Sequence, residues 1–132
     1  NSKSVKKTFT ESAQNSIQNQ PKFKITTDTI HVKITSGKAK IDTAKTAGQR
    51  LVFVLNSDTA NKLALKITPK DSVANLRINQ IIDSKNNSDG PFGQELEYII
   101  KEKGTHKIIV SESQMAGEAW AGKFSFEVKL KW

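Results

Sequence analysis

The residue types that carry most catalytic chemistry are sparse in this sequence. It holds two histidines, His31 and His106, and no cysteine. A hydrolytic triad needs a nucleophile beside a base that a carboxylate orients. Both histidines instead stand among the polar residues of predicted strands, so we interpret them as surface or cross-strand histidines. Phosphate loops, Gly-x-Ser-x-Gly elbows and His-Glu-x-x-His motifs are also absent. The sequence therefore predicts a protein that is not an enzyme.

The turn-rich segment 83–90 is the best candidate for a metal site. Asp83, Asn87 and Asp89 offer the hard oxygens that Ca²⁺ prefers. A calcium loop needs about six ligands at regular spacing, and Lys85 occupies the third position counted from Asp83. We therefore interpret the segment as a turn built from Asn, Asp and Gly, with these three residues as weak metal candidates. No cofactor is predicted.

Two carboxylates, Glu95 and Glu97, alternate with Leu96 on a predicted strand. This spacing points both carboxylates to one solvent face. A glycosidase pair would also need a cleft and a contribution from a second strand. Because any amphipathic strand has the same pattern, we do not assign catalysis to this pair.

The strongest candidate for binding is a connector between the strands 104–111 and 122–132, too long for a tight turn. It carries Met115, Glu118 and Trp120, and Met and Trp are enriched in binding interfaces. These three residues are our candidate contact surface. Alternatively, Trp120 packs back over the end of the core as a plug, with Met115 beneath it. We expect Trp132 to cap the core edge at the last strand.

The elements that must position these residues are β-strands. In the last strand four apolar residues alternate strictly with polar ones, as expected when one face meets a core and the other meets water; they are Phe124, Phe126, Val128 and Leu130. About eight such segments, separated by turn signals and without a convincing helix, predict an all-β antiparallel β-sandwich or jelly roll.

Two segments give more detailed expectations. The continuous apolar run 50–56 predicts a strand buried on both faces. Residues 38–42 predict a short edge strand, and lysines on such a strand oppose aggregation by sheet extension. Lys33, Lys38 and Lys40 fit that role.

Residues 1–21 are predicted to be a polar, flexible lead or tether, and residues 22–132 a single β-sandwich domain. Net charge is +8, and residues 1–40 hold eight lysines against Glu11 and Asp28. Such charge favours a nearby anionic surface or simply keeps the protein soluble. Specific nucleic-acid binding is not predicted, because Phe124 and Phe126 lie on the core row rather than on a basic face.

Three short motifs carry a resemblance to a known family. They are Gly48-Gln-x-Leu-x-Phe-x-Leu, Gly104-Thr-His-Lys-Ile-Ile-Val and Lys123-Phe-Ser-Phe-Glu-Val. Over roughly residues 28–132 this pattern resembles bacterial pre-peptidase C-terminal (PPC-like) β-sandwich domains, and the layout is similar to that of periplasmic inhibitors of g-type lysozyme. His106 stands where the PPC-like pattern usually has Tyr.

The resemblance implies an exported, non-catalytic domain, periplasmic or on the cell surface, that binds a protein or a cell-envelope glycan. The polar lead would suit a bacterial lipoprotein with a lipid anchor upstream of Asn1. One alternative is an inhibitor of a cell-wall hydrolase, and another is a structural accessory module. The inhibitor family carries basic side chains in its final interstrand region. Here that region carries Glu112 and Glu118 before Lys123, so no family site residues are transferred.

Overall fold

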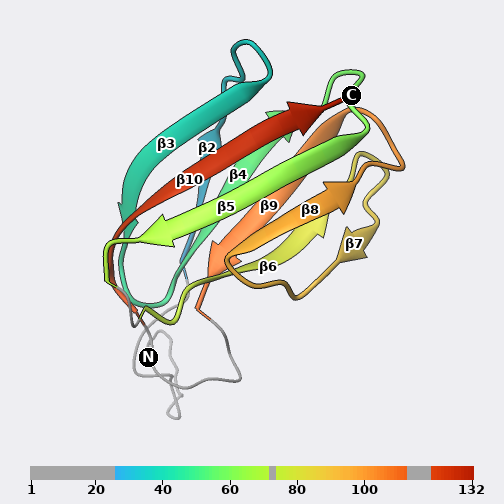
Figure 1. Ribbon diagram of the computed structural model, residues 1–132. Helices are drawn as coiled ribbons and strands as arrows, with labels where there is room; N and C mark the ends of the chain where they lie inside the picture. Colours follow the sequence, from blue (N-terminus) through green and yellow to red (C-terminus); the bar gives the residue numbers. More distant parts are fainter. Residues whose placement is uncertain (1–25, 72–73, 113–119) are drawn as a thin grey trace, which may run out of the picture.

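The computed structural model describes residues 26–71, 74–112 and 120–132. Over these residues nine strands and no helix form two sheets that pack face to face (Figure 1). The four-stranded sheet has the order β3 (Lys38–Lys45), β10 (Gly122–Lys131), β5 (Lys62–Pro69) and β8 (Glu95–Ile99). The five-stranded sheet has the order β2 (Thr26–His31), β4 (Gln49–Asn56), β9 (Thr105–Ser111), β6 (Arg77–Ile82) and β7 (Ser88–Asp89). The predicted all-β sandwich is confirmed.

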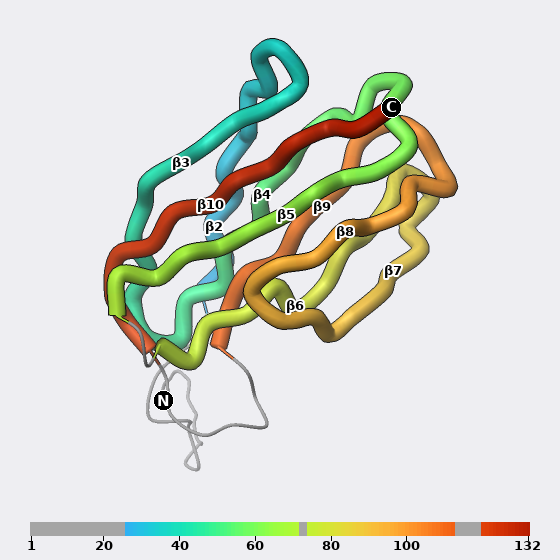
Figure 2. Tube along the Cα trace, in the orientation of Figure 1, coloured from blue at the N-terminus to red at the C-terminus, as the bar shows by residue number. Residues whose placement is uncertain are grey.

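One strand pair departs from the antiparallel pattern. β2 runs parallel to β4, with Thr26 opposite Gln49 and His31 opposite Val54. Between these two strands the chain crosses to the other sheet, forms β3 and returns (Figure 2). A parallel pair needs such a crossover connection, and here a strand of the opposite sheet supplies it. The sandwich is therefore mostly, not wholly, antiparallel.

The core lies between the sheets and uses the alternation seen in the sequence. All four apolar residues of the last strand are buried, as predicted. From the opposite sheet Phe53 stacks on Phe126, with ring centroids 4.0 Å apart, and meets Phe124 edge to face at 6.3 Å. Such aromatic pairs contribute about 0.5–1.5 kcal/mol beyond the area they bury. These rings join the two sheets.

The prediction that residues 50–56 are buried on both faces is wrong. Leu51, Phe53 and Leu55 are buried, whereas Val52 and Val54 on the other face are only half-buried. β4 lies between β2 and β9 in its sheet, and only its inner face meets the second sheet.

Some strand limits also differ from the predicted ones. β3 reaches Lys45, three residues beyond its expected end, and it is an edge strand with exposed Lys38 and Lys40, as predicted. Residues 1–25 lie outside the described residues, so the predicted lead over 1–21 stays a prediction. No helix in the described ranges has the length and apolar character to span a bilayer.

Candidate functional site

The two ends of the connector are tied together by one buried lysine. Lys45 Nζ lies 2.8 Å from Glu112 Oε2 and donates to the carbonyl of Trp120, also at 2.8 Å. The same Glu112 oxygen accepts the backbone N–H of Trp120 at 2.8 Å and that of Gly48 at 3.2 Å. We call Lys45, Glu112 and Trp120 the connector clamp. It fixes the chain where it enters and leaves the segment 113–119.

The clamp is a buried ion pair whose hydrogen bonds are well satisfied. The Lys45 side chain is 0% exposed, and its third acceptor is the carbonyl of Thr46 at 2.8 Å. An ammonium group has three donors, so each has a partner. Burial raises the pKa of Glu112, but the bond from Lys45 and the N–H groups of Trp120 and Gly48 outweigh it and hold this pKa below its ordinary value. The Glu112 carboxylate is therefore ionised at neutral pH.

Trp120 belongs to the core in this structure. Its side chain is part of the hydrophobic cluster, and the residue is 8% exposed. The ring packs so closely on Gly122 that a Cβ there would lie 2.7 Å from Cζ2. This placement corresponds to the predicted plug. Met115 and Glu118 lie outside the described residues, so a contact surface on the connector stays a prediction.

Sequence reasoning missed the roles of Lys45 and Glu112. Because β3 was expected to end at Asp42, Lys45 was never assigned a face. With the strand extended, Ile41, Thr43 and Lys45 share the inward row. Strand parity would have placed the lysine inside, and a buried lysine requires an anionic partner.

The two histidines differ in their surroundings. His31 is exposed at the end of β2, as predicted. The surface interpretation of His106 is wrong, because this residue is 0% exposed and shares the inward row of β9 with Ile108 and Val110. Its Nδ1 lies 2.9 Å from the carbonyl of Gly104, and its Nε2 has no hydrogen-bond partner among the described residues. His106 packs edge to face on Tyr98, with the ring centroids 6.0 Å apart, as a member of the core.

Of the metal candidates of segment 83–90, Asp83 and Asn87 close a turn, and Asp89 lies in the short strand β7. Asp83 Oδ1 accepts the N–H groups of Lys85 and Asn87 at 2.9 Å, and Oδ2 accepts the Asn87 amide at 3.2 Å. Asp89 accepts the N–H of Gly90 at 2.9 Å. Burial raises the pKa of Asp83, but the bonds from Asn87 and Lys85 outweigh it and hold the pKa low. Within the described ranges no three acidic or histidine side chains cluster as metal ligands would.

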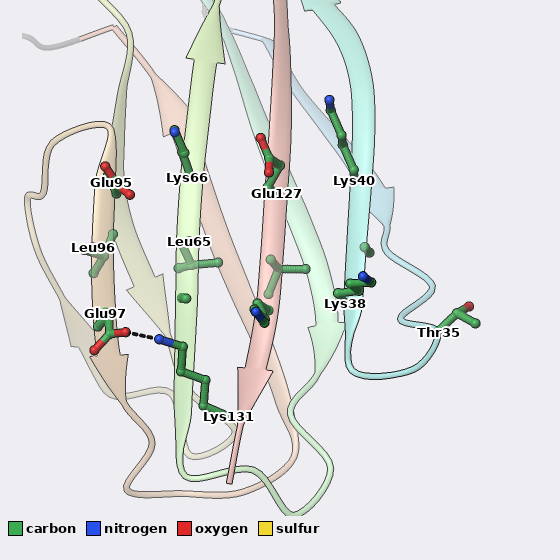
Figure 3. A pocket seen from close by; sticks show the side chains of 14 residues that line it. Thr35, Lys38, Lys40, Leu65, Lys66, Glu95, Leu96, Glu97, Glu127 and Lys131 are labelled. Carbon is green, nitrogen blue, oxygen red and sulfur yellow. Dashed lines mark hydrogen bonds and ion pairs between the residues drawn. The ribbon is translucent and has the colours of Figure 1, made fainter.

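The outer face of the four-stranded sheet carries a regular array of charges. In one row across the sheet, Lys40 stands opposite Glu127, Glu127 opposite Lys66, and Lys66 opposite Glu95. Figure 3 shows these four side chains at one level, each from a different strand. The charge alternates at every step of the row. Both Glu95 and Glu97 lie on this solvent face, as the sequence predicted.

A hollow of about 840 Å³ lies on the same face. In the next row Lys38 stands opposite Lys129, Lys129 opposite Ala64, and Ala64 opposite Glu97. Ala64 has the one short side chain of that row, so the surface of the sheet is depressed at Ala64 relative to the longer side chains on either side. We call the outer side chains of these two rows the charged face; they are Lys38, Lys40, Ala64, Lys66, Glu95, Glu97, Glu127 and Lys129.

Among the described residues, most charges of this face make no ion pair. On the charged face the structure describes a single ion pair, in which Lys131 reaches Glu97 from the neighbouring row (Figure 3). The bond from Lys131 and its charge lower the pKa of Glu97. Glutamates lie at the β8 edge and lysines predominate on β3 and β10. The face is therefore acidic at one edge and basic toward the other.

No family model matches the sequence, and no curated protein matches it. Several solved structures share the fold. Aeromonas hydrophila PliG, a periplasmic lysozyme inhibitor of g-type lysozyme, superposes with a TM-score of 0.62 at 14% identity, over 80% of this chain and 98% of that chain. The corresponding inhibitor of Salmonella Typhimurium has a TM-score of 0.58 at 14% identity, over 78% of this chain and 98% of that chain.

A pre-peptidase C-terminal domain of a Bacillus anthracis collagenase covers 85% of this chain and 100% of its own length at 13% identity. Its TM-score is 0.47. The inhibitor structures confirm the layout inferred from the sequence. At these identities the likeness establishes the fold, which this chain shares over nearly the whole length of both inhibitors.

Proposed function

We propose that this chain is an exported, non-catalytic domain that binds a lysozyme-class cell-wall hydrolase and inhibits it. The observation that carries the proposal is the charged face, present on a fold shared with two periplasmic lysozyme inhibitors over 98% of their lengths. The hollow over Ala64 gives a partner side chain a place to enter. The charges that flank the hollow would orient the partner protein on this face.

The charge pattern suits an enzyme of this class. Most glycosidases cleave their substrate with a pair of carboxylates that flank the scissile bond, so their clefts present negative charge. Lys38, Lys40 and Lys129 lie at the basic side of the charged face. Complementary charge across an interface raises the association rate and selects the partner. We therefore orient the basic side toward the cleft.

The cellular location is part of the same proposal. The two inhibitors that share the fold are periplasmic, which supports export for this chain. A lipid anchor upstream of Asn1 would keep the domain at the envelope surface. The precursor sequence tests this directly: an apolar signal segment that ends in cysteine is expected, and its absence would contradict the anchor.

The test of inhibition is lysis of cell walls by g-type, c-type and i-type lysozymes with and without the purified protein. We expect the lysis rate of at least one class to fall with a dose response. An unchanged rate of lysis by all three classes would contradict the proposed inhibition.

Two paired variants locate the site. Lys38→Gln with Lys40→Gln removes two of the three lysines at the basic side of the charged face and should weaken inhibition about tenfold or more, since each close charge pair at an interface contributes more than about 1 kcal/mol. Lys101→Gln with Lys107→Gln removes the same charge from exposed positions outside that face and should leave inhibition unchanged. Equal effects of both pairs would contradict the assignment of the charged face.

A further inference from the structure

A second recess lies at the end of the sandwich opposite the connector clamp, where β10 ends (Figure 1). Its volume is about 450 Å³, within the range of small-ligand sites. The walls are Ser36, Asn56, Asp58 and Trp132, and buried Val32 and Leu130 contribute to its floor. The predicted capping role of Trp132 is only partly met, because this residue lies beside the core edge but is 64% exposed. An apolar ring therefore faces an open polar recess.

The Trp132 ring is held in place although it is exposed. Its Nε1 donates to Thr59 Oγ1 at 2.8 Å. At the other end, a Cβ on Gly37 would lie 3.3 Å from Cζ3, and Gly37 has φ +76°, which favours glycine. The ring thus bridges the loop after β4 and the turn before β3. A preorganised ring loses little entropy when a ligand binds to it.

Unused polar groups lie beside the ring. The backbone N–H of Asp58 donates to Asn56 Oδ1 at 2.7 Å, which fixes the Asn56 side chain with its amide Nδ2 as the remaining donor. Within the described residues neither this Nδ2 nor the Asp58 carboxylate has a hydrogen-bond or ion-pair partner. The recess therefore offers one donor, one acceptor and one flat apolar surface.

We propose that this recess binds a neutral saccharide, which goes beyond the proposed inhibition of a hydrolase. A pyranose has an apolar C–H face and polar hydroxyl edges. The indole face carries the negative side of its quadrupole and attracts polarised C–H groups. Hydroxyls at the edge of the sugar then accept from Asn56 Nδ2 and donate to the Asp58 carboxylate.

The chemistry of the walls disfavours other stacking ligands. A nucleotide brings phosphate, and single-stranded nucleic-acid sites need a basic track. The charged side chain of this recess is Asp58, which repels phosphates and acidic sugars alike. A quaternary ammonium group is usually held by a cage of several aromatic rings, whereas Trp132 is the one aromatic residue that lines the recess. A neutral sugar is the ligand that these groups favour.

The experiment is a nuclear magnetic resonance titration that follows the indole N–H signals of both tryptophans. The probes are chitotetraose and cellotetraose, both neutral, and tetragalacturonic acid, which is acidic. We expect a neutral probe to shift the Trp132 signal to saturation and to leave the buried Trp120 signal in place. The acidic probe should bind at least about tenfold more weakly.

Variants make the test specific. Trp132→Ala should weaken binding of the neutral probe about tenfold or more, the loss expected when one aromatic contact is removed. Calorimetry measures the binding of the probe to this variant. Ile99→Ala truncates an equally exposed residue, also 64% exposed, at a β8 position outside the recess, and should change nothing. Asp58→Asn is compatible with the left-handed φ of 53° at this position. It should raise the affinity for the acidic probe close to the affinity for the neutral probes.

Three results would overturn the proposal: no response to either neutral tetrasaccharide, equal binding of the acidic probe to the native protein, or unchanged binding in Trp132→Ala. If Trp132→Ala instead weakens hydrolase inhibition and no saccharide binds, the recess belongs to a protein interface and the saccharide proposal is wrong. Lysozyme inhibition is measured separately, so either proposal can fail while the other stands.

Discussion

The two tryptophans at the ends of β10 occupy opposite kinds of environment. Trp120, just before the strand, is 8% exposed, and Trp132, just after it, is 64% exposed. Both rings rest on a glycine, Gly122 in one case and Gly37 in the other. Around Trp120 the clamp satisfies the polar groups internally, whereas beside Trp132 a donor and an acceptor are left over. We call the end of the sandwich with Trp120 and the clamp the closed end, and the end with Trp132 and the recess the open end. The two ends differ in their unused polar groups rather than in the type of their aromatic residue.

The largest expected effect is at the closed end. Trp120→Ala removes a buried ring and should lower the free energy of unfolding by about 4 kcal/mol, because the cavity cannot close fully. Urea unfolding measures this change. A loss below about 1 kcal/mol, together with lost hydrolase binding, would instead make Trp120 part of a contact surface.

The clamp should matter nearly as much. Lys45→Met leaves the carboxylate of Glu112 without its counter-ion, and breaking a buried pair in this way costs about 3 kcal/mol or more. Lys38→Met is the matched control on the exposed row of the same strand, and surface changes stay within about 0.5 kcal/mol. Equal stability of the two variants by urea unfolding would show that the clamp contributes little.

Acid should weaken the closed end. The folded-state pKa of Glu112 is below its ordinary value of 4.5, so its contribution is complete above that pH and is lost as pH falls through the folded pKa. Asp83 and Glu97 shift in the same direction, so Glu112→Gln isolates the clamp. The stability gap between native protein and variant should narrow below about pH 4.5. A gap that is constant from neutral pH to about pH 3 would contradict this.

The smallest expected effect is at the open end. Trp132→Ala should change the free energy of unfolding by less than about 1 kcal/mol, because a largely exposed side chain gains little from burial. Thermal unfolding of this variant beside Trp120→Ala compares the two ends directly. A comparable loss in both would show that Trp132 is also part of the core.

Local alternation predicted much of the fold. The inward row from Phe124 to Leu130 was correct because a strand with a period of two has only one way to bury its apolar side. His106 was misjudged because its polar side chain was given more weight than its place in the row of Ile108 and Val110.

The candidate sites could not be predicted in the same way. The recess at Trp132 combines segments around residues 36, 57 and 131, which become neighbours only after both sheets have formed. The charged face needs the strand order β3-β10-β5-β8, which pairs strands distant in sequence. Alternation shows which face a side chain takes, but not which strand lies beside it.

The clamp also has a consequence for variation of the chain. Lys45 and Glu112 fix both ends of segment 113–119 to the sandwich. The entropy cost of closing a loop grows slowly, by about 0.6 kcal/mol for each doubling of length. Insertions and replacements between residues 112 and 120 should therefore leave the sheets intact. The domain is suited to serve as a scaffold on which segment 113–119 varies in sequence while the two sheets stay constant.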